Sequence, residues 1–330
     1  MSVSYKDAGV DIAAGEQAVK EIKNLVKQTF TPNVLTEIGL FGGCFAFPVK
    51  NYRQPVLVAS TDGVGTKLIV ANLLDRHNTV GQCLVNHCVN DILTTGARPL
   101  FFLDYIGTGQ LKPAITTEII RGISLACKAN GCALIGGEMA EMTDIYQTKD
   151  YDLVGTIIGV VEREQMLIGR VGKGDVLLGL PSTGLHTNGY SLARKVLLTK
   201  YSVTDFIPEL NATIGDALLA IHRSYLNVIE PLLADPDLHG LSHITGGGII
   251  GNTSRIVPEN LTLKINWQAW EWPPLFKFIQ KTGEIDIEEM RRVFNLGIGM
   301  IIICAASAVD KFSQVLQKSG EKAVILGEVC

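Results

Sequence analysis

The chain has 330 residues, of which 47% are hydrophobic and 19% are charged, and its formal net charge is −4. This composition excludes a mainly disordered chain, and the length suggests about two domains. The acidic balance does not favour a nucleic-acid partner, because such partners are bound through a basic excess. The most apolar stretch, residues 296–309, is shorter than the roughly 20 apolar residues that span a membrane, so no membrane partner is expected.

The periodicity of apolar residues predicts alternating helices and strands in two blocks. In the first block we expect helices over 11–28, 79–95 and 115–130 and strands over 55–60, 100–105, 132–135 and 152–161. In the second block we expect strands over 175–180, 261–265, 299–304 and 324–327 and helices over 188–199, 214–234, 249–256 and 273–281. The glycine-rich stretch 169–174 separates the blocks, which is typical of a two-domain α/β or α+β protein with domains 1–168 and 169–330.

Seven cysteines are scattered along the chain. Their odd number and wide spacing do not fit a disulfide-stapled secreted domain, so a reducing, cytoplasmic setting is expected. Cys83 and Cys88 lie close to His87, and a zinc site is one alternative. Packing of these thiols as small hydrophobic groups is favoured, because they fall in apolar helical runs.

Neither a P-loop nor a dinucleotide fingerprint is present, yet glycine-rich loops with charged residues follow several predicted strands. The first reads Asp-Gly-Val-Gly-Thr-Lys over residues 62–67. Gly63 and Gly65 let backbone N–H groups turn toward an anion, Lys67 adds a positive charge, and Asp62 is suited to a divalent cation. These are the parts of a magnesium–phosphate site; the alternative is a glycine turn with a solvated Lys–Asp pair.

Further carboxylates occur in two places. Asp91 follows Asn90 late in an apolar helix, where a buried carboxylate needs a partner; it is either a metal ligand, with His87 one turn earlier, or a helix-surface acid. Glu138 and Glu141 follow a predicted strand and a double glycine, and on a helix they would share one face. Such oxygen ligands suit Mg²⁺. The alternative for the glutamates is a turn with two exposed acids.

A polar cluster lies between the strand 175–180 and the next helix. The segment 182–191 contains hydroxyls, His186 and Asn188, and amides at a helix start favour a phosphate group. His186 is suited to acid–base work. Capping of the helix by Thr187 or Asn188 is the alternative, although it does not explain so many polar groups together.

Two more glycine loops occur near the C-terminus. Residues 243–248 read His-Ile-Thr-Gly-Gly-Gly before a predicted helix, which is the pattern of an anion-binding turn or of a flexible turn. Residues 294–300 carry Asn295 and two glycines at the entry to a strand, where core packing is the stronger interpretation for every residue except Asn295.

Taken in order with the opening segment 4–11, these loops closely resemble the aminoimidazole ribonucleotide (AIR) synthetase family of cyclo-ligases over nearly the whole chain. The resemblance implies closure of the imidazole ring of formylglycinamidine ribonucleotide with ATP and Mg²⁺, releasing ADP and phosphate. It also implies an AIR synthase-like fold, with an α/β N-terminal domain, an α+β C-terminal domain, and a homodimer whose N-terminal strands form a shared β-barrel. The alternatives are a related kinase or selenophosphate synthetase, and a nucleotide-binding protein without turnover.

The resemblance also suggests roles for residues. The implied Mg²⁺ ligands are Asp62, Asp91 and Glu138. The implied ATP-binding residues are Lys6, Asp62, Gly63, Gly65, Thr66 and Lys67. The implied substrate-binding residues are Ser182, His186, Asn188, Thr245, Gly246, Gly247 and Gly248. Catalytic roles would fall to Lys67, Glu141, His186 and Asn188. Thr143, where the family usually has proline, is a departure in the loop that carries the two glutamates.

Overall fold

The protein is described here by a computed structural model, which covers residue 5 and residues 8–330. The chain forms two compact units. The first unit contains the described residues up to Val89 together with Pro99–Val160, and the second contains Asn90–Arg98 and Val161–Cys330. Residues 90–98 therefore group with the second unit, although they lie within the first half of the sequence.

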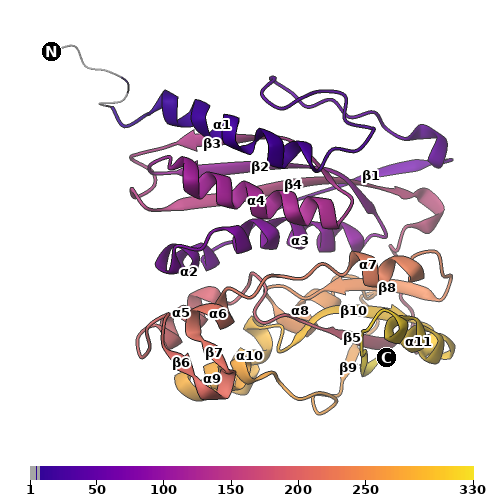
Figure 1. Cartoon of the computed structure of the whole chain (residues 1–330). Coiled ribbons are helices and arrows are strands. Elements are labelled where there is room, and N and C mark those ends of the chain that lie inside the picture. The colour runs from indigo at the N-terminus through magenta and orange to yellow at the C-terminus, as the bar shows by residue number, and fades with distance from the viewer. Residues whose placement is uncertain (1–4, 6–7) are drawn as a thin grey trace. The chain divides into compact units, whose positions relative to one another are not determined.

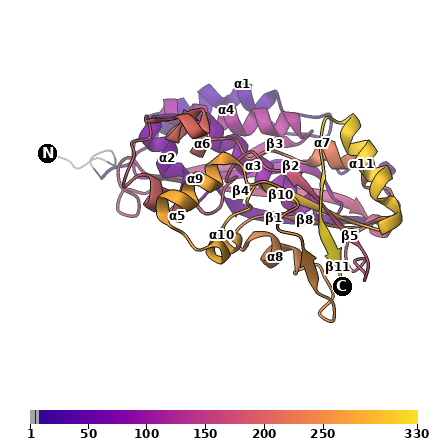
Figure 2. The same ribbon diagram turned by 90° about the horizontal axis from the view of Figure 1, so that it is seen from below.

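The first unit is a four-stranded sheet with helices. Its helices are α1 (Ile12–Lys27), α2 (Lys67–Leu74), α3 (Asn78–Leu93, whose last turn groups with the second unit) and α4 (Pro113–Ala129), with a 3₁₀ turn at Val49–Asn51. Its strands are β1 (Pro55–Gly63), β2 (Arg98–Thr108), β3 (Ala133–Glu141) and β4 (Tyr151–Glu162), in the order β1-β4-β2-β3. Strands β2 and β3 are parallel. Helices α1 and α4 pack side by side and both contact β3 (Figures 1 and 2).

Helix α1 shows how local sequence sets these elements. The Asp11 carboxylate accepts a hydrogen bond from the Ala14 amide at 3.3 Å and so caps the first turn. Ala18, Ile22 and Val26 follow at intervals of one helical turn and are buried. Lys27 lies in the last turn, where the helix dipole favours a positive charge.

The sheet of the first unit keeps one open face. Along β1, exposed residues alternate with partly buried ones, and the Leu57 side chain is 63% exposed. Alternate residues of a strand point to opposite faces, so the exposed set of β1 shares one face. Leu57 at this position is an apolar side chain that faces solvent in the single chain.

The second unit is built on a five-stranded sheet in the order β8-β10-β5-β11-β9. Its strands are β5 (Val176–Pro181), β8 (Leu238–His243), β9 (Leu263–Ile265), β10 (Ile298–Cys304) and β11 (Val324–Val329), with a separate pair β6 (Phe206–Ile207) and β7 (Ala212–Thr213). Its helices are α5 (Tyr190–Leu197), α6 (Ile214–Leu218), α7 (Leu226–Ile229), α8 (Gly248–Thr253), α9 (Pro274–Gly283), α10 (Ile287–Val293) and α11 (Val309–Lys318). Short 3₁₀ turns lie at Arg163–Gln165, Pro208–Leu210, Glu230–Leu232 and Ala306–Ala308.

Strand β10 forms the centre of this unit. It pairs antiparallel with both β5 and β8, and all seven of its residues are buried. A strand covered on both faces reads as a continuous apolar run, which is the sequence pattern at 298–304. The loops that follow β5 and β8 and the loop that precedes β10 carry the predicted site residues of the second unit.

The prediction of one continuous helix over 214–234 is wrong. Helix α6 ends at Leu218 and α7 begins at Leu226, with an irregular segment between them. The side chain of Asn90 binds the backbone of this segment, accepting from the Tyr225 amide at 2.9 Å and donating to the Arg223 carbonyl at 2.9 Å. Because those backbone groups are paired with a distant side chain, they do not form helical hydrogen bonds.

Other expectations need smaller corrections. Strands β1 and β3 continue through Asp62–Gly63 and Gly136–Glu141, which were expected to form loops. Helices α2, α10 and α11 and strand β8 were not anticipated. The seven cysteines form no disulfide, and five of them are buried, as expected for thiols in apolar runs. Among the described helices, none is long and apolar enough to cross a membrane.

Candidate functional site

Asp62 is held by a histidine in the first unit. It lies at the end of β1, and its Oδ2 is 2.8 Å from Nε2 of His87 on α3. The histidine side chain is 4% exposed, whereas the aspartate is 44% exposed. The other carboxylate oxygen accepts from the Gly63 amide at 2.6 Å. His87 and the Gly63 amide therefore fix the orientation of the carboxylate, and its exposed part remains accessible to a cation.

The turn after Asp62 has the backbone geometry expected of an anion-binding loop. Gly65 has φ of +62°, which favours glycine, and α2 begins two residues later. A side chain at Gly63 would approach the Leu153 carbonyl to 3.1 Å, so glycine keeps β1 close to β4. Thr66 is the N-cap residue of α2, which places the turn at the positive end of the helix.

The side chain of Lys67 was expected to be accessible to phosphate, but it does not face solvent. Its side chain is fully buried, and Nζ donates to Sγ of Cys83 at 3.2 Å. Removal from water lowers the pKa of this lysine, because burial disfavours the charged form. A contact of Lys67 with ATP phosphates requires the side chain to turn outward, and that contact stays a prediction.

Glu138 and Glu141 do not share a face. Both belong to β3, and residues three apart on a strand point to opposite sides. Glu138 is exposed, and its Oε1 accepts from the Met139 amide at 2.8 Å. The two oxygens of Glu141 accept from the amides of Leu111 at 2.8 Å and Asp11 at 2.7 Å. Glu138 is thus open to a ligand, whereas Glu141 joins the loop after β2 to the start of α1.

A cavity of about 610 Å³ lies beside Glu138 in the first unit. It is lined by residues of α1, α4, β2, β3 and the segment 37–43. Asp104 on β2 lines it, is 8% exposed, and has its pKa raised to about 7 by burial. A side chain at Gly137 would lie 2.4 Å from Oδ1 of Asp104, so glycine makes room for this acid. Sequence reasoning missed Asp104; the signal was an acid inside the apolar run 100–106.

Asn90 and Asp91 anchor the second unit. The side-chain carbonyl oxygen of Asn90 accepts a hydrogen bond from the Tyr225 amide. Its NH₂ group donates to the Arg223 carbonyl and, at 3.1 Å, to Nε2 of His222. Asp91 Oδ1 is 2.8 Å from Nδ1 of His243, at the end of β8. The partner that a carboxylate on an apolar helix needs is therefore a histidine.

The segment that follows β5 is tied to the entry of β10. Ser182 Oγ donates to Oδ1 of Asn295 at 3.0 Å, and Asn295 donates to the Gly184 carbonyl at 3.0 Å. His186 has φ of +60° and is fully buried; its Nε2 accepts from the Thr183 amide at 3.2 Å. Contact of the buried His186 with substrate stays a prediction.

The triple-glycine loop is held from inside by Asn252. The Asn252 amide donates to the carbonyls of Thr245, Gly246 and Gly248, at 3.2, 3.2 and 2.8 Å. Gly247 and Gly248 have positive φ, and a side chain at Gly248 would lie 1.9 Å from the Arg291 carbonyl. Asn188 lies next to this loop, because its Oδ1 would be 3.3 Å from a side chain at Gly246.

The structure thus forms two groups from the predicted residues. In the first unit it places Asp62, Gly63, Gly65 and Thr66 together between the end of β1 and the start of α2, whereas Glu138 is on β3, the opposite edge strand of the sheet. In the second unit, Asn188 lies beside the loop 245–248, and Ser182 is joined to Asn295. Lys6 lies outside the described residues. Sequence reasoning missed Asn252 and His222, for which no local pattern gave a signal.

Solved structures define the class of fold. The chain matches a thiamine-monophosphate kinase from Stenotrophomonas maltophilia with a TM-score of 0.71 at 16% identity, covering 95% of this chain and 93% of that one. It also matches the hydrogenase maturation protein HypE in complex with ATP, with a TM-score of 0.70 at 17% identity, covering 98% and 88%. At such low identity these neighbours establish the shared two-domain fold.

Sequence comparison defines the family. Residues 48–161 match the family model for the N-terminal domain of AIR synthase related proteins, and residues 172–330 match the model for the C-terminal domain. The chain belongs to the AIR synthase family. It is 50% identical over 330 residues to a phosphoribosylformylglycinamidine cyclo-ligase from Thermoanaerobacter sp. strain X514, covering 99% of this chain and 97% of the relative. A cyclo-ligase from Thermodesulfovibrio yellowstonii is 49% identical over 331 residues, covering 99% and 96%.

Proposed function

We propose that the chain is a phosphoribosylformylglycinamidine cyclo-ligase of purine biosynthesis, working as a cytoplasmic enzyme. The observation that carries the proposal is identity at about half of the aligned positions over nearly the full length of two cyclo-ligases. The structural neighbours include a kinase, but at 16% identity that likeness supports the fold and not the reaction.

The reaction closes an imidazole ring by activating a formyl group. ATP transfers its γ-phosphoryl group to the formyl oxygen of formylglycinamidine ribonucleotide, and ADP departs. The amidine-side nitrogen then attacks the formyl carbon, and phosphate leaves with the former formyl oxygen. Such catalysis depends mainly on positioning and charge neutralisation, which fits a chain whose polar loops consist of acids, amides and glycine turns.

Magnesium fits the exposed acids. Asp62 and Glu138 present carboxylate oxygens at the surface of the first unit, and Asp91 is 26% exposed in the second. These are the hard oxygen donors that Mg²⁺ takes alongside water and phosphate oxygens. When bound, the ion neutralises phosphate charge. His87 and His243 hold Asp62 and Asp91 in place through one oxygen each.

The nucleotide is best accommodated in the first unit. The cavity beside Glu138 has the size of a small-ligand pocket and is lined largely by apolar side chains, which suits a planar base. Asp104, with its pKa near 7, can offer either an O–H donor or an acceptor to the base edge. The turn at Gly63–Thr66 would receive the phosphates through backbone N–H groups.

The ribonucleotide substrate is best accommodated in the second unit. The loop Thr245–Gly248 would bind its ribose phosphate, because positive-φ glycines expose backbone N–H groups to an anion. Asn188 lies beside this loop and would orient the amidine or formyl part, together with Ser182. His186 is buried, so its contribution would be to support the loop that carries Asn188.

One assay tests the reaction. The protein is incubated with ATP, Mg²⁺ and formylglycinamidine ribonucleotide, and ADP, phosphate and aminoimidazole ribonucleotide are measured. We expect all three products in equal amounts. A phosphorylated acyclic product would instead support a kinase, and nucleotide binding without ADP would support a non-catalytic role. Either result would contradict the cyclo-ligase.

The open sheet face of the first unit supports a homodimer. Leu57 is apolar and exposed on β1, and a second copy of the sheet would cover it in a shared barrel. Light scattering should give twice the mass of 35.7 kDa for one chain. Leu57→Glu should shift the protein to monomer, whereas Ile325→Glu, at a 55% exposed position of β11 in the other unit, should not. Dimers of equal strength in both variants would exclude this face.

A further inference from the structure

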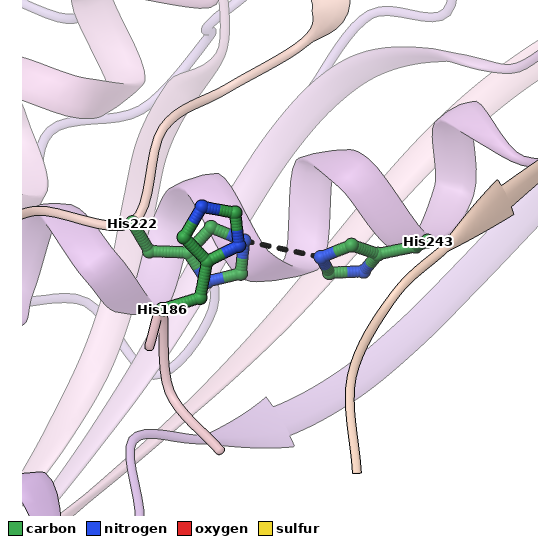
Figure 3. Close-up of side chains that lie close together, drawn as sticks. All are labelled: His186, His222 and His243. Carbon is green, nitrogen blue, oxygen red and sulfur yellow. Dashed lines mark hydrogen bonds between the residues drawn. The ribbon is translucent and has the colours of Figure 1, made fainter. Parts of the chain in front are cut away.

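Three histidines from distant segments meet inside the second unit. His186 follows β5, His222 lies in the irregular segment before α7, and His243 ends β8 (Figure 3). They are 0%, 0% and 6% exposed. One ring nitrogen from each lies within 4.8 Å of the others. The cluster adjoins one of the carboxylates proposed to hold Mg²⁺, because His243 is hydrogen-bonded to Asp91.

The outer nitrogens of two of these rings are held by oxygen atoms. His243 Nδ1 is 2.8 Å from Asp91 Oδ1, and His222 Nδ1 is 3.3 Å from Oγ1 of Thr187. The inner Nε2 atoms of His222 and His243 face one another at 3.0 Å, as the dashed line in Figure 3 shows. Histidines that bind metals typically donate their second N–H to a carboxylate or another oxygen in this way.

Asn90 sets the tautomer of His222. Its carbonyl oxygen accepts from the Tyr225 amide, so its NH₂ group must be the part that donates to the Arg223 carbonyl and to His222 Nε2. His222 therefore carries its proton on Nδ1 and has a lone pair on Nε2. A deprotonated ring nitrogen is the form that binds a metal ion, and an ion at Nε2 would replace the hydrogen bond from Asn90.

His186 supplies a third imidazole after a small rearrangement. Its ring stacks on His222 with 3.9 Å between centroids and 14° between planes. Lone pairs lie in the ring planes, so His186 must rotate about its Cβ–Cγ bond to direct a nitrogen at the same point, a torsion with broad preferences. Only glycine fits at position 299, because a side chain there would lie 2.4 Å from Cε1 of His186.

We propose that His186, His222 and His243 form a binding site for a transition-metal ion, with Zn²⁺ as the best match. Three imidazoles suit Zn²⁺, Co²⁺, Ni²⁺ or Cu²⁺ and do not suit Mg²⁺, which prefers oxygen ligands. Nitrogen ligands at about 2.0–2.1 Å from a tetrahedral ion lie about 3.3 Å apart, close to the 3.0 Å between the facing nitrogens. The ion would join three segments of the second unit.

The test uses the full chain with Cys44→Ser and Cys330→Ser, which removes the two exposed thiols as competing ligands. After chelator treatment, Co²⁺ is added as a spectroscopic probe and Zn²⁺ is titrated in competition with a chromophoric chelator. We expect one equivalent of Co²⁺ with visible d–d bands of a nitrogen-ligated tetrahedral site and no thiolate charge-transfer band. Zn²⁺ should displace it, and a large excess of Mg²⁺ should not.

Variants connect the signal to the site. His222→Ala should weaken Zn²⁺ binding by at least about 100-fold, and Thr187→Val, which removes only the outer oxygen, by about 10-fold. His239→Ala is the matched control, because His239 lies on β8 but pairs with Asp175 at 2.8 Å. Circular dichroism checks that each variant is folded. The cobalt spectrum of the protein with all three histidines tests the site even if a histidine variant does not fold. Absence of that spectrum, or equal Zn²⁺ affinity in folded His222→Ala, would overturn the proposal.

Discussion

Each unit contains an aspartate paired with a histidine, and the two pairs have the same separation but different surroundings. Asp62 and His87 are 2.8 Å apart in the first unit, and Asp91 and His243 are 2.8 Å apart in the second. Both histidines are almost fully buried, but Asp62 is 44% exposed and Asp91 only 26%.

The difference lies in what each pair is connected to. Asp62 ends a strand, and its second oxygen accepts from the adjoining Gly63 amide. Asp91 is linked through His243 to His222, which is also bound by Asn90. The same pair of residue types therefore presents an acid to a ligand in the first unit, and in the second unit it also organises a buried polar network.

The largest expected effect separates the two acids. Asp62→Asn and Asp91→Asn should each lower kcat/KM for cyclisation by about 10³-fold, because each removes a carboxylate ligand of the Mg²⁺ ion that would neutralise phosphate charge. A higher Mg²⁺ concentration should partly restore the activity of Asp62→Asn, because the role proposed for Asp62 is to bind the ion. It should not restore Asp91→Asn, whose acid also fixes His243.

The measurement is steady-state ADP release at a series of Mg²⁺ concentrations, with circular dichroism to confirm folding. Equal rescue of both variants would remove the distinction between the pairs. Near-normal turnover of Asp91→Asn would exclude Asp91 from the metal site.

The next effect concerns the glycine loop of the second unit. Gly248→Ala should lower the free energy of unfolding by about 3 kcal/mol, because the residue has φ of +65° and the new methyl group would meet the Arg291 carbonyl. Gly251→Ala is the control, since nothing lies within 4 Å of a side chain there. Urea unfolding measures both. A loss of similar size in the control would mean that loop geometry is not the cause.

The smallest effect uses the buried acid of the first unit. Asp104 has its pKa raised from 3.8 to about 7, so the folded protein binds a proton that the unfolded chain releases above pH 4. Its contribution to stability is therefore complete below pH 4 and is lost as pH rises toward 7. Asp104→Asn, which stays neutral, should stabilise the protein by about 2 kcal/mol at pH 8 and by little at pH 4.

Unfolding by urea at both pH values tests this prediction. Asp62→Asn provides a comparison, because its carboxylate is exposed and paired with His87. A stabilisation by Asp104→Asn of the same size at both pH values would show that the burial of charge is not its source.

Much of the fold could be predicted from local pattern. Helix α1 has buried residues at one-turn spacing and a capping Asp11, and β10 is a continuous apolar run; neither depends on distant residues for its type. The order of the glycine loops along the chain also indicated the correct family. Asp91 was correctly expected to need a partner, which is His243.

The remainder depended on distant contacts. Whether Glu138 and Glu141 share a face is decided by pairing of β3 with β2, which keeps the segment extended. The break near His222 is caused by Asn90, which is 132 residues away in the sequence. Burial of Lys67 against Cys83 also has no local signal, because a lysine beside glycines is normally solvated. Periodicity describes one element at a time and therefore could not find these features.

The position of Asn90 has a consequence for how the protein is made. Its partners at His222, Arg223 and Tyr225 leave the ribosome more than 130 residues later, a delay of roughly 7 to 26 s at typical rates of synthesis. During that interval all residues of the first unit are synthesised. Residues 90–98 are also made, but the other residues of the second unit, from Val161 onward, are still incomplete. The second unit therefore cannot be obtained intact by cutting the gene at the apparent boundary, because a fragment that begins at Val161 lacks the asparagine around which its 219–225 segment is arranged.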